Sequence, residues 1–177
     1  MAPTEVGTWT TEINGKQITF ECTASDLYHV KQSEAYPYTF ATTSGEPWAW
    51  KGETSWRAFT HLLPLESRYK EYLDLRKSQS YTCVQSIVVS YINGDAFWAN
   101  EGGTAFELHS GGKNYDKWNP GYYKWIDRRI EYANSIDMVP VIVFTWAQEF
   151  VKFSDAQFER FTEYMVSRWA AYNVMWV

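Results

Sequence analysis

The chain has 177 residues, of which 45% are hydrophobic and 21% are charged, and its formal net charge at pH 7 is −5. This length suits one domain, or one domain and a fragment of another, and the hydrophobic content argues against a disordered chain. The acidic balance argues against nucleic-acid binding, which needs clustered Lys and Arg, and no apolar run approaches the roughly 18 residues that cross a bilayer.

Aromatic residues make up 19% of the chain. Aromatic rings pack in cores and also stack on the apolar faces of sugar rings, so composition alone leaves both uses open. The two cysteines, Cys22 and Cys83, fit neither a disulfide framework nor a zinc motif. His29, His61 and His109 stand in unlike contexts without metal-ligand spacing, so we expect no metal and no cofactor.

Residues 1–46 are predicted to form β-strands. The runs GTWTTEI (7–13), KQITFECTA (16–24) and YPYTFAT (36–42) alternate or are rich in β-branched and aromatic residues. The dipeptide Asn-Gly between the first two runs is a strong hairpin signal. A few strands cannot form an independent domain, so we expect this segment to be the tail of a β-sandwich-like domain or a cap on the rest of the chain.

Strands and helices alternate from residue 47 onward. The predicted strands are PWAWKG (47–52), TCVQSIVVSYI (82–92), MVPVIVFTW (138–146) and NVMWV (173–177). The second and third have the continuous β-branched composition of parallel strands that are buried on both faces. The glycine-rich stretch 93–113 has no clear period and is predicted to be a loop.

Three helices are predicted between these strands. Pro64 is expected to open the first, Asn119 to cap the second ahead of Pro120, and Ser154 and Gln157 to form a capping box for the third. The charged run DRRIE in the second helix is expected to face solvent. Apolar residues recur at helical spacing along all three: Leu65, Tyr69 and Leu73; Tyr122, Ile126 and Ile130; Phe158, Phe161 and Met165.

The alternation β-α-β-α-β-α-β predicts parallel strands joined by right-handed crossovers. Two architectures fit it, an open doubly wound sheet and part of a (β/α)8 barrel. The sequence GETSW after the first strand is not a GxGxxG phosphate loop, which argues against a Rossmann unit. A complete barrel needs about 250 residues. The predicted fold is therefore α/β, with residues 47–177 forming half of a TIM barrel behind the β segment 1–46.

In either architecture the working face lies at the carboxyl ends of the strands. Aromatic platforms beside carboxylates and amides are what a sugar site needs, and each strand end offers this combination. The candidate residues are Glu53, Thr54, Trp56 and His61 after the first strand, Tyr91, Asn93 and Asp95 after the second, and Trp146, Gln148 and Glu149 after the third.

Glu53 and Glu149 are the candidate catalytic carboxylates. Glycosidases use two carboxyl groups, about 5–5.5 Å apart when they retain configuration and about 6.5–9.5 Å apart when they invert it. No GxSxG nucleophile elbow is present, so a Ser-His-Asp assignment would be arbitrary. Structural alternatives stay open: Glu53 could pair with Lys51 or Arg57, Asp95 could stabilise a turn, and the tryptophans could belong to the core.

Four segments resemble the apiosidase-like glycoside hydrolases: FATTSGEPWAWKGETSWRAF, YLDLRKSQSYTCVQ, NPGYYKWIDRRIEYANSIDMVPVIVFTW and SRWAAYNVMWV. The resemblance covers residues 38–177. It rests on the combination of a G-x-T-x-W after the first strand, a Y-L-x-x-R-x-x-Q helix, an N-P-x-Y-x-x-x-x-D helix start and a Trp that closes the third strand. Ser80 stands where the family more often has a glycine, which weakens a tight turn.

The resemblance implies a (β/α)8 catalytic domain of about twice this length. It implies that Glu53, Thr54, Trp56 and Trp146 face the substrate. In the family, the general acid/base follows the fourth strand and the nucleophile follows a later one, so the family's catalytic pair is not expected on any residue here. Residues 1–37 resemble the end of the small β domain that often precedes such barrels.

We therefore expect a glycoside hydrolase that acts on a plant or microbial polysaccharide or oligosaccharide in an extracellular or periplasmic setting. A carbohydrate-binding module with an aromatic face is an alternative, and an unrelated open α/β enzyme is a weaker one. Half a barrel leaves two open edges and an uncovered interior, so we also expect a homo-oligomer in which two copies complete the barrel. No nucleic-acid or membrane partner is expected.

Overall fold

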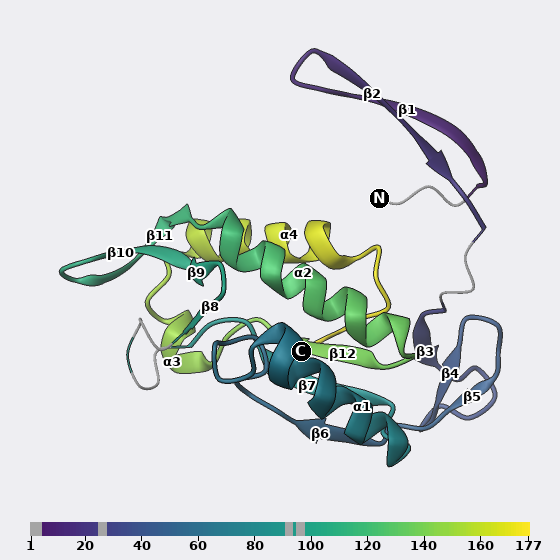
Figure 1. Cartoon of the computed structure of the whole chain (residues 1–177). Helices are drawn as coiled ribbons and strands as arrows, with labels where there is room; N and C mark the ends of the chain where they lie inside the picture. The colour runs from purple at the N-terminus through teal and green to yellow at the C-terminus, as the bar shows by residue number, and fades with distance from the viewer. Residues whose placement is uncertain (1–4, 25–27, 91–93, 95–97) are drawn as a thin grey trace.

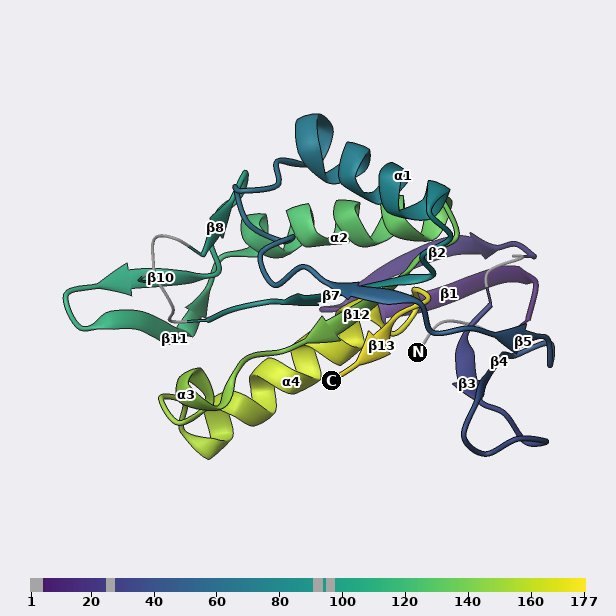
Figure 2. The same ribbon diagram turned by 90° about the horizontal axis from the view of Figure 1, so that it is seen from below.

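The structure is a computed structural model that describes residues 5–24, 28–90, 94 and 98–177 (Figure 1). Its centre is a parallel sheet with the strand order β13-β12-β7-β6. Residues of α2 and α4 share one core cluster with Ile142 of this sheet, residues of α1 and α2 share another with Val84, and α1 and α2 run side by side (Figure 2). Within the described part of the chain, no helix is long and apolar enough to cross a membrane.

The four parallel strands are β6 (Gly52–Thr54), β7 (Cys83–Ile87), β12 (Val139–Val143) and β13 (Met175–Trp176). Adjacent strands pair in parallel, as the β-α alternation predicts. Every residue of β12 is buried, because helices cover one face and aromatic side chains cover the other. The predicted parallel half-barrel is confirmed.

The helices begin close to where the sequence signals place them. The Asn119 side chain accepts a hydrogen bond from the backbone N–H of Gly121, and Ser154 and Gln157 form the expected capping box. Pro64 precedes the first helical residue instead of occupying that position. The helical segments are η1 (Leu65–Tyr69, a π-helical turn), α1 (Lys70–Ser78), α2 (Pro120–Ser135), α3 (Ala147–Phe150) and α4 (Asp155–Trp169).

The sequence predicted that residues 47–52 form the first parallel strand, and this prediction is wrong. Pro47–Trp48 forms β5, which pairs antiparallel with β4 (Phe40–Thr42), and the parallel strand starts only at Gly52. A Cβ atom at Gly52 would lie 2.6 Å from the Sγ atom of Cys83. Glycine is therefore needed where β6 passes closely beside β7.

The stretch 93–113 was expected to be a loop, but its described part contains short strands. They are β8 (Ala99–Asn100), β9 (Gly103–Thr104), β10 (Phe106–His109) and β11 (Gly112–Trp118). They pair as two antiparallel hairpins, β8–β9 and β10–β11. The β10–β11 hairpin projects beyond the carboxyl ends of β7 and β12 (Figure 1).

The N-terminal strands form two antiparallel sheets. Strands β1 (Gly7–Ile13) and β2 (Lys16–Cys22) make the predicted hairpin, with Asn14 and Gly15 at the positive φ angles that a tight turn requires. This hairpin is exposed along almost its whole length and stands away from the parallel sheet (Figure 1). The division of the chain at residues 46 and 47 stays a prediction.

The second N-terminal sheet closes the amino end of the parallel sheet. It consists of β3 (Val30–Gln32), β4 and β5. Trp48 of β5 packs on Cys83 and Val139, the first residues of β7 and β12. At the same end, Ser80 adopts a left-handed φ of 63° in the α1–β7 connection, which is the conformation that a glycine would adopt without strain.

Candidate active site

Aromatic side chains meet at the carboxyl ends of the parallel strands. Ile87 and Val143, which end β7 and β12, form a buried cluster with Trp98, and Trp56 and Trp146 pack against it. The rings of Trp56 and Trp146 lie 5.2 Å apart between centroids at an interplanar angle of 79°. This edge-to-face contact brings the ends of the first and third parallel strands together.

A buried arginine on α2 fixes the loop that carries Trp56. Arg129 has no exposed surface, although the run DRRIE was expected to face solvent. Its guanidinium donates to the carbonyls of Ala58 at 3.1 Å and Leu63 at 3.0 Å, and to the Glu101 carboxylate at 2.8 Å. Solvent exposure was the wrong expectation for Arg129 because the loop carbonyls and Glu101 supply its hydrogen-bond partners inside the fold.

Glu53 lies on the helix side of the sheet and not at the carboxyl end of its strand. It pairs in register with Val84, the second residue of β7, and both of its carboxylate oxygens accept hydrogen bonds from Arg76 at the end of α1. The hydrogen bond that Arg76 donates to Glu53 raises the pKa of the Arg76 guanidinium. Glu53 was expected to lie at the carboxyl end of its strand, where the sugar would bind. This is wrong, because Glu53 is the middle residue of β6 and the loop after the strand begins two residues later.

Replacing Glu53 with Gln is expected to lower the thermal midpoint and to leave oligosaccharide affinity within about twofold of the parent value. The reason is that Glu53 holds α1 to the sheet and faces away from the Trp56–Trp146 contact. Calorimetry and a saccharide titration would measure the two effects, and Arg76→Gln is the matched control because it removes the same ion pair. A folded Glu53→Gln protein that no longer binds or cleaves sugar would contradict this placement.

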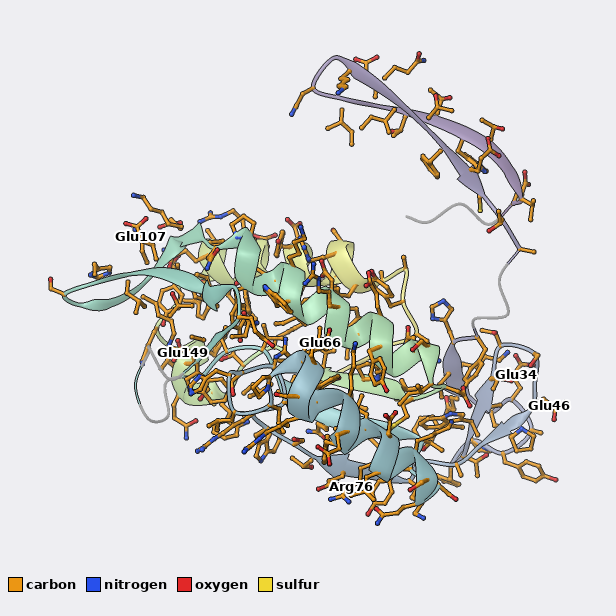
Figure 3. The ribbon with its side chains drawn as sticks, viewed as in Figure 1. Glu34, Glu46, Glu66, Arg76, Glu107 and Glu149 are labelled. Carbon is orange, nitrogen blue, oxygen red and sulfur yellow. The ribbon has the colours of Figure 1, made fainter. Side chains whose placement is uncertain are left out.

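Glu149 is fully buried in α3, directly after β12. Its Oε1 atom accepts from Lys113 Nζ at 2.8 Å and from the Tyr115 hydroxyl at 2.7 Å, and its Oε2 atom lies 3.4 Å from Lys152 Nζ. Only 3% of the Lys113 side chain is exposed. Figure 3 places Glu149 and Arg76, the partner of Glu53, at opposite ends of the sheet, so the structure does not bring the two candidate carboxylates together.

A polar cavity of about 440 Å³ borders this cluster. The β10–β11 hairpin supplies His109, Asn114 and Tyr115 to its lining, and the α3–α4 region supplies Lys152 and Gln157. The Nδ1 atom of His109 accepts from the backbone N–H of Gly111, so in the neutral ring the proton lies on Nε2. The size and the hydrogen-bonding groups suit a hydroxyl-rich ligand.

The remaining predicted residues divide into two groups. Thr54, His61 and Gln148 are exposed; Thr54 ends β6, and Trp56 lies in the turn that follows it. The backbone N–H of His61 donates to the carbonyl of Ala99 at 2.8 Å, which ties the loop after β6 to β8. The other group, Tyr91, Asn93 and Asp95, lies outside the described residues.

Three residues that lie near the carboxyl ends of the strands were not identified from the sequence. Trp98, Lys113 and Tyr115 all fall in or beside the stretch assigned to a loop. The signal that points to the β10–β11 hairpin is Ser110-Gly111, a turn dipeptide between runs that alternate apolar and polar residues. The pairing of Lys113 with Glu149 has no local signal, because the two residues are 36 positions apart.

The described residues hold no group of three or more His, Cys, Asp or Glu side chains that could bind a metal ion. Cys83 is not a reactive thiol either. Burial raises the pKa of its thiol to about 11, which keeps the sulfur protonated at neutral pH.

Family membership follows from a match to the family model described as the apiosidase-like catalytic domain, which covers residues 35–177. The chain belongs to the apiosidase-like family. No curated protein sequence matches the apiosidase-like chain.

Solved structures of glycoside hydrolases share the fold of this apiosidase-like chain. A glycoside hydrolase family 5 protein from Bacteroides vulgatus is 21% identical with a TM-score of 0.65, over 84% of this chain and 32% of its own. A putative glycoside hydrolase from the same organism is 18% identical with a TM-score of 0.66, over 99% of this chain and 38% of its own. The chain thus spans about a third of these proteins and has the fold of a partial (β/α)8 barrel.

Proposed function

We propose that this apiosidase-like chain is part of a glycoside hydrolase and that a sugar ring stacks on the aromatic surface formed by Trp56 and Trp146. The observation that carries the proposal is the contact of these two indoles at the carboxyl ends of β6 and β12, the rim where barrel enzymes bind substrates. Exposed Thr54 and Gln148 offer hydrogen-bonding groups near this rim for sugar hydroxyls.

The substrate class we propose is a plant or microbial polysaccharide or oligosaccharide, met outside the cytoplasm. Family membership supports hydrolysis of an O-glycosidic bond. Cleavage needs two carboxyl groups that flank this bond. Glu53 is bound by Arg76, and Glu149 is buried between Lys113 and Tyr115. We therefore propose that neither carboxylate cleaves the bond: Glu53 holds α1 to the sheet, and Glu149 supports the turn that carries Trp146.

The test is a panel of plant and bacterial oligosaccharides, followed by tryptophan fluorescence and by a reducing-sugar assay on the same samples. Saturable binding is the result that the proposal expects, and released sugar would mean that carboxyl groups other than Glu53 and Glu149 cleave the bond. No fluorescence change and no released sugar across the panel would contradict it.

Glu53 and Glu149 both pair with side chains of the protein, which favours a second candidate function: a carbohydrate-binding module that holds sugar without cleaving it. Its expected result in the same panel is a saturable fluorescence change with no released reducing sugar. Released sugar that depends on protein concentration would exclude this candidate.

We propose in addition that the 177-residue chain forms a homodimer through the open edges of its sheet. The edge strands are β6 and β13, and the apolar side chains of Phe40, Trp50 and Val177 are exposed beside β13. Light scattering after size-exclusion chromatography is expected to give about twice the 20.7 kDa of one chain. Trp50→Lys should shift this mass toward the monomer, whereas a monomer at every concentration of the parent protein would contradict the proposal.

A further inference from the structure

A buried polar network includes Glu149, which lies in the turn after β12. Glu149 and Lys113 form its ion pair, and Lys113 Nζ also donates to the carbonyl of Ser90, which follows β7, at 3.1 Å. The Tyr115 hydroxyl completes it. The network therefore joins three segments that are distant in sequence: the end of β7, the β10–β11 hairpin and the turn after β12.

The turn after β12 carries Trp146. Trp146 is the residue before α3, and its carbonyl accepts hydrogen bonds from the backbone N–H groups of Glu149 and Phe150, each at 2.9 Å. Trp146 and Glu149 therefore belong to one helical turn, so a displacement of this turn would move both residues. A helix of four residues has no stability of its own, because helix formation needs several turns to offset nucleation. Its position must come from tertiary contacts.

Those contacts converge on the network. Tyr115 donates to Glu149 while its ring lies 4.0 Å from the ring of Phe153, which follows α3. Phe153 in turn packs in the large core cluster with Phe106 and Phe161. The β10–β11 hairpin thus holds the α3 region in place through two contacts of Tyr115: a charge-assisted hydrogen bond to Glu149 and ring packing on Phe153.

Stability alone does not account for a buried ion pair. Replacing such a pair with apolar side chains of similar size is often neutral or stabilising, because removing two charges from water is costly. An ion pair differs from apolar packing because it fixes the orientation of the two side chains, since a carboxylate accepts hydrogen bonds only in defined geometries.

We propose that Glu149, Lys113 and Tyr115 are positioning residues that hold the Trp146 indole against Trp56 and so set the geometry of the sugar-stacking surface. The link to sugar rests on the proposed function, but the link to Trp146 does not. Removing the network should therefore leave a folded protein in which the two indoles no longer keep their edge-to-face arrangement and the sugar affinity falls.

The test combines Lys113→Met with Glu149→Met, which removes both charges at similar side-chain volume. The readout is the exciton couplet of the Trp56–Trp146 pair in circular dichroism, defined as the difference between the parent protein and Trp146→Phe. We expect the double variant to keep a cooperative unfolding transition, to lose most of the couplet and to bind oligosaccharide about tenfold more weakly. A folded double variant with an unchanged couplet would overturn the proposal.

Two further proteins keep the test decisive. Asp127→Asn with Arg168→Met breaks a partly buried ion pair between α2 and α4 and should lower stability without changing the couplet. Tyr115→Phe removes one hydrogen bond to Glu149 and keeps the ring, so it should fold and lose part of the couplet. If the double variant does not fold, a full couplet in Tyr115→Phe would overturn the proposal. If the variants lose the couplet but the parent protein binds no sugar, the positioning role is supported and the proposed function is contradicted.

Discussion

Replacing Trp146 with alanine is expected to weaken oligosaccharide binding about tenfold or more while the protein remains folded. The change removes the ring that contacts Trp56 at 5.2 Å. An aromatic contact of this kind contributes roughly 0.5–1.5 kcal/mol beyond the area it buries, and about 1.4 kcal/mol corresponds to a factor of ten in affinity. Trp146 is only half-buried, so its removal should disturb the rim more than the core.

The measurement is a fluorescence or calorimetric titration with the best ligand of the saccharide panel. Trp125→Ala is the matched control, because Trp125 is also half-buried but lies on α2, where it stacks with Arg128. Trp146→Phe should fall between the parent protein and the alanine variant, since it keeps a smaller ring. Equal affinities for Trp146→Ala and the parent protein would place the sugar elsewhere on the molecule.

Replacing Arg129 with methionine is expected to cost about 3–5 kcal/mol of unfolding free energy, since removing one partner leaves the other groups of a buried pair uncompensated. The methionine would leave the carbonyls of Ala58 and Leu63 without their donors and the carboxylate of Glu101 without its counter-ion. This is a large share of the roughly 5–15 kcal/mol that stabilises a typical domain. Urea denaturation would measure it, with a constant slope as the check on two-state behaviour.

Arg128→Met is the matched control for this experiment. Arg128 is the neighbouring residue on α2, and it lies over the Trp125 ring instead of inside the loop. Its replacement should change stability by no more than about 1 kcal/mol, as a typical exposed cation–π contact contributes. Equal losses from the two variants would contradict the role assigned to Arg129.

The Arg129 variant should also alter the acid sensitivity of the fold. Burial alone would raise the pKa of Glu101, but the backbone amides of Leu65 and Glu101 and the guanidinium of Arg129 outweigh it and lower this pKa. A carboxyl whose pKa is lower in the folded state stabilises the fold above its unfolded pKa, and this contribution disappears as the pH falls through the folded pKa. In Arg129→Met this part of the acid destabilisation should become smaller.

Much of the fold is readable from local patterns. The β-branched runs around Val84 and Val141 predict buried parallel strands, and Asn119-Pro120 and Ser154 predict the helix starts, because these signals depend on residues close together in the chain. The contact of Trp56 with Trp146 also follows from topology, since parallel strands end at the same edge.

Other features could not be read because they depend on long-range partners. Arg129 looks like part of a solvated charged run until the loop carbonyls that surround it are known. Glu149 looks like a rim carboxylate, but Lys113 lies on a hairpin 36 residues earlier. The first parallel strand was placed too early because the apolar Pro47–Trp48 segment has a partner in β4. In each case a tertiary contact overrides the local pattern.

The most direct measurement is the response of the tryptophan indole N–H signals to sugar in a two-dimensional nitrogen–proton NMR spectrum. The signals can be assigned by single Trp→Phe replacements, and Trp169, which is fully buried against α2, serves as the internal reference. Saturation with a bound oligosaccharide is expected to move the Trp56 and Trp146 signals and to leave the Trp169 and Trp125 signals in place. Binding that moves only Trp9 or Trp50, on the N-terminal strands and the amino end of the sheet, would contradict a sugar site at the carboxyl ends.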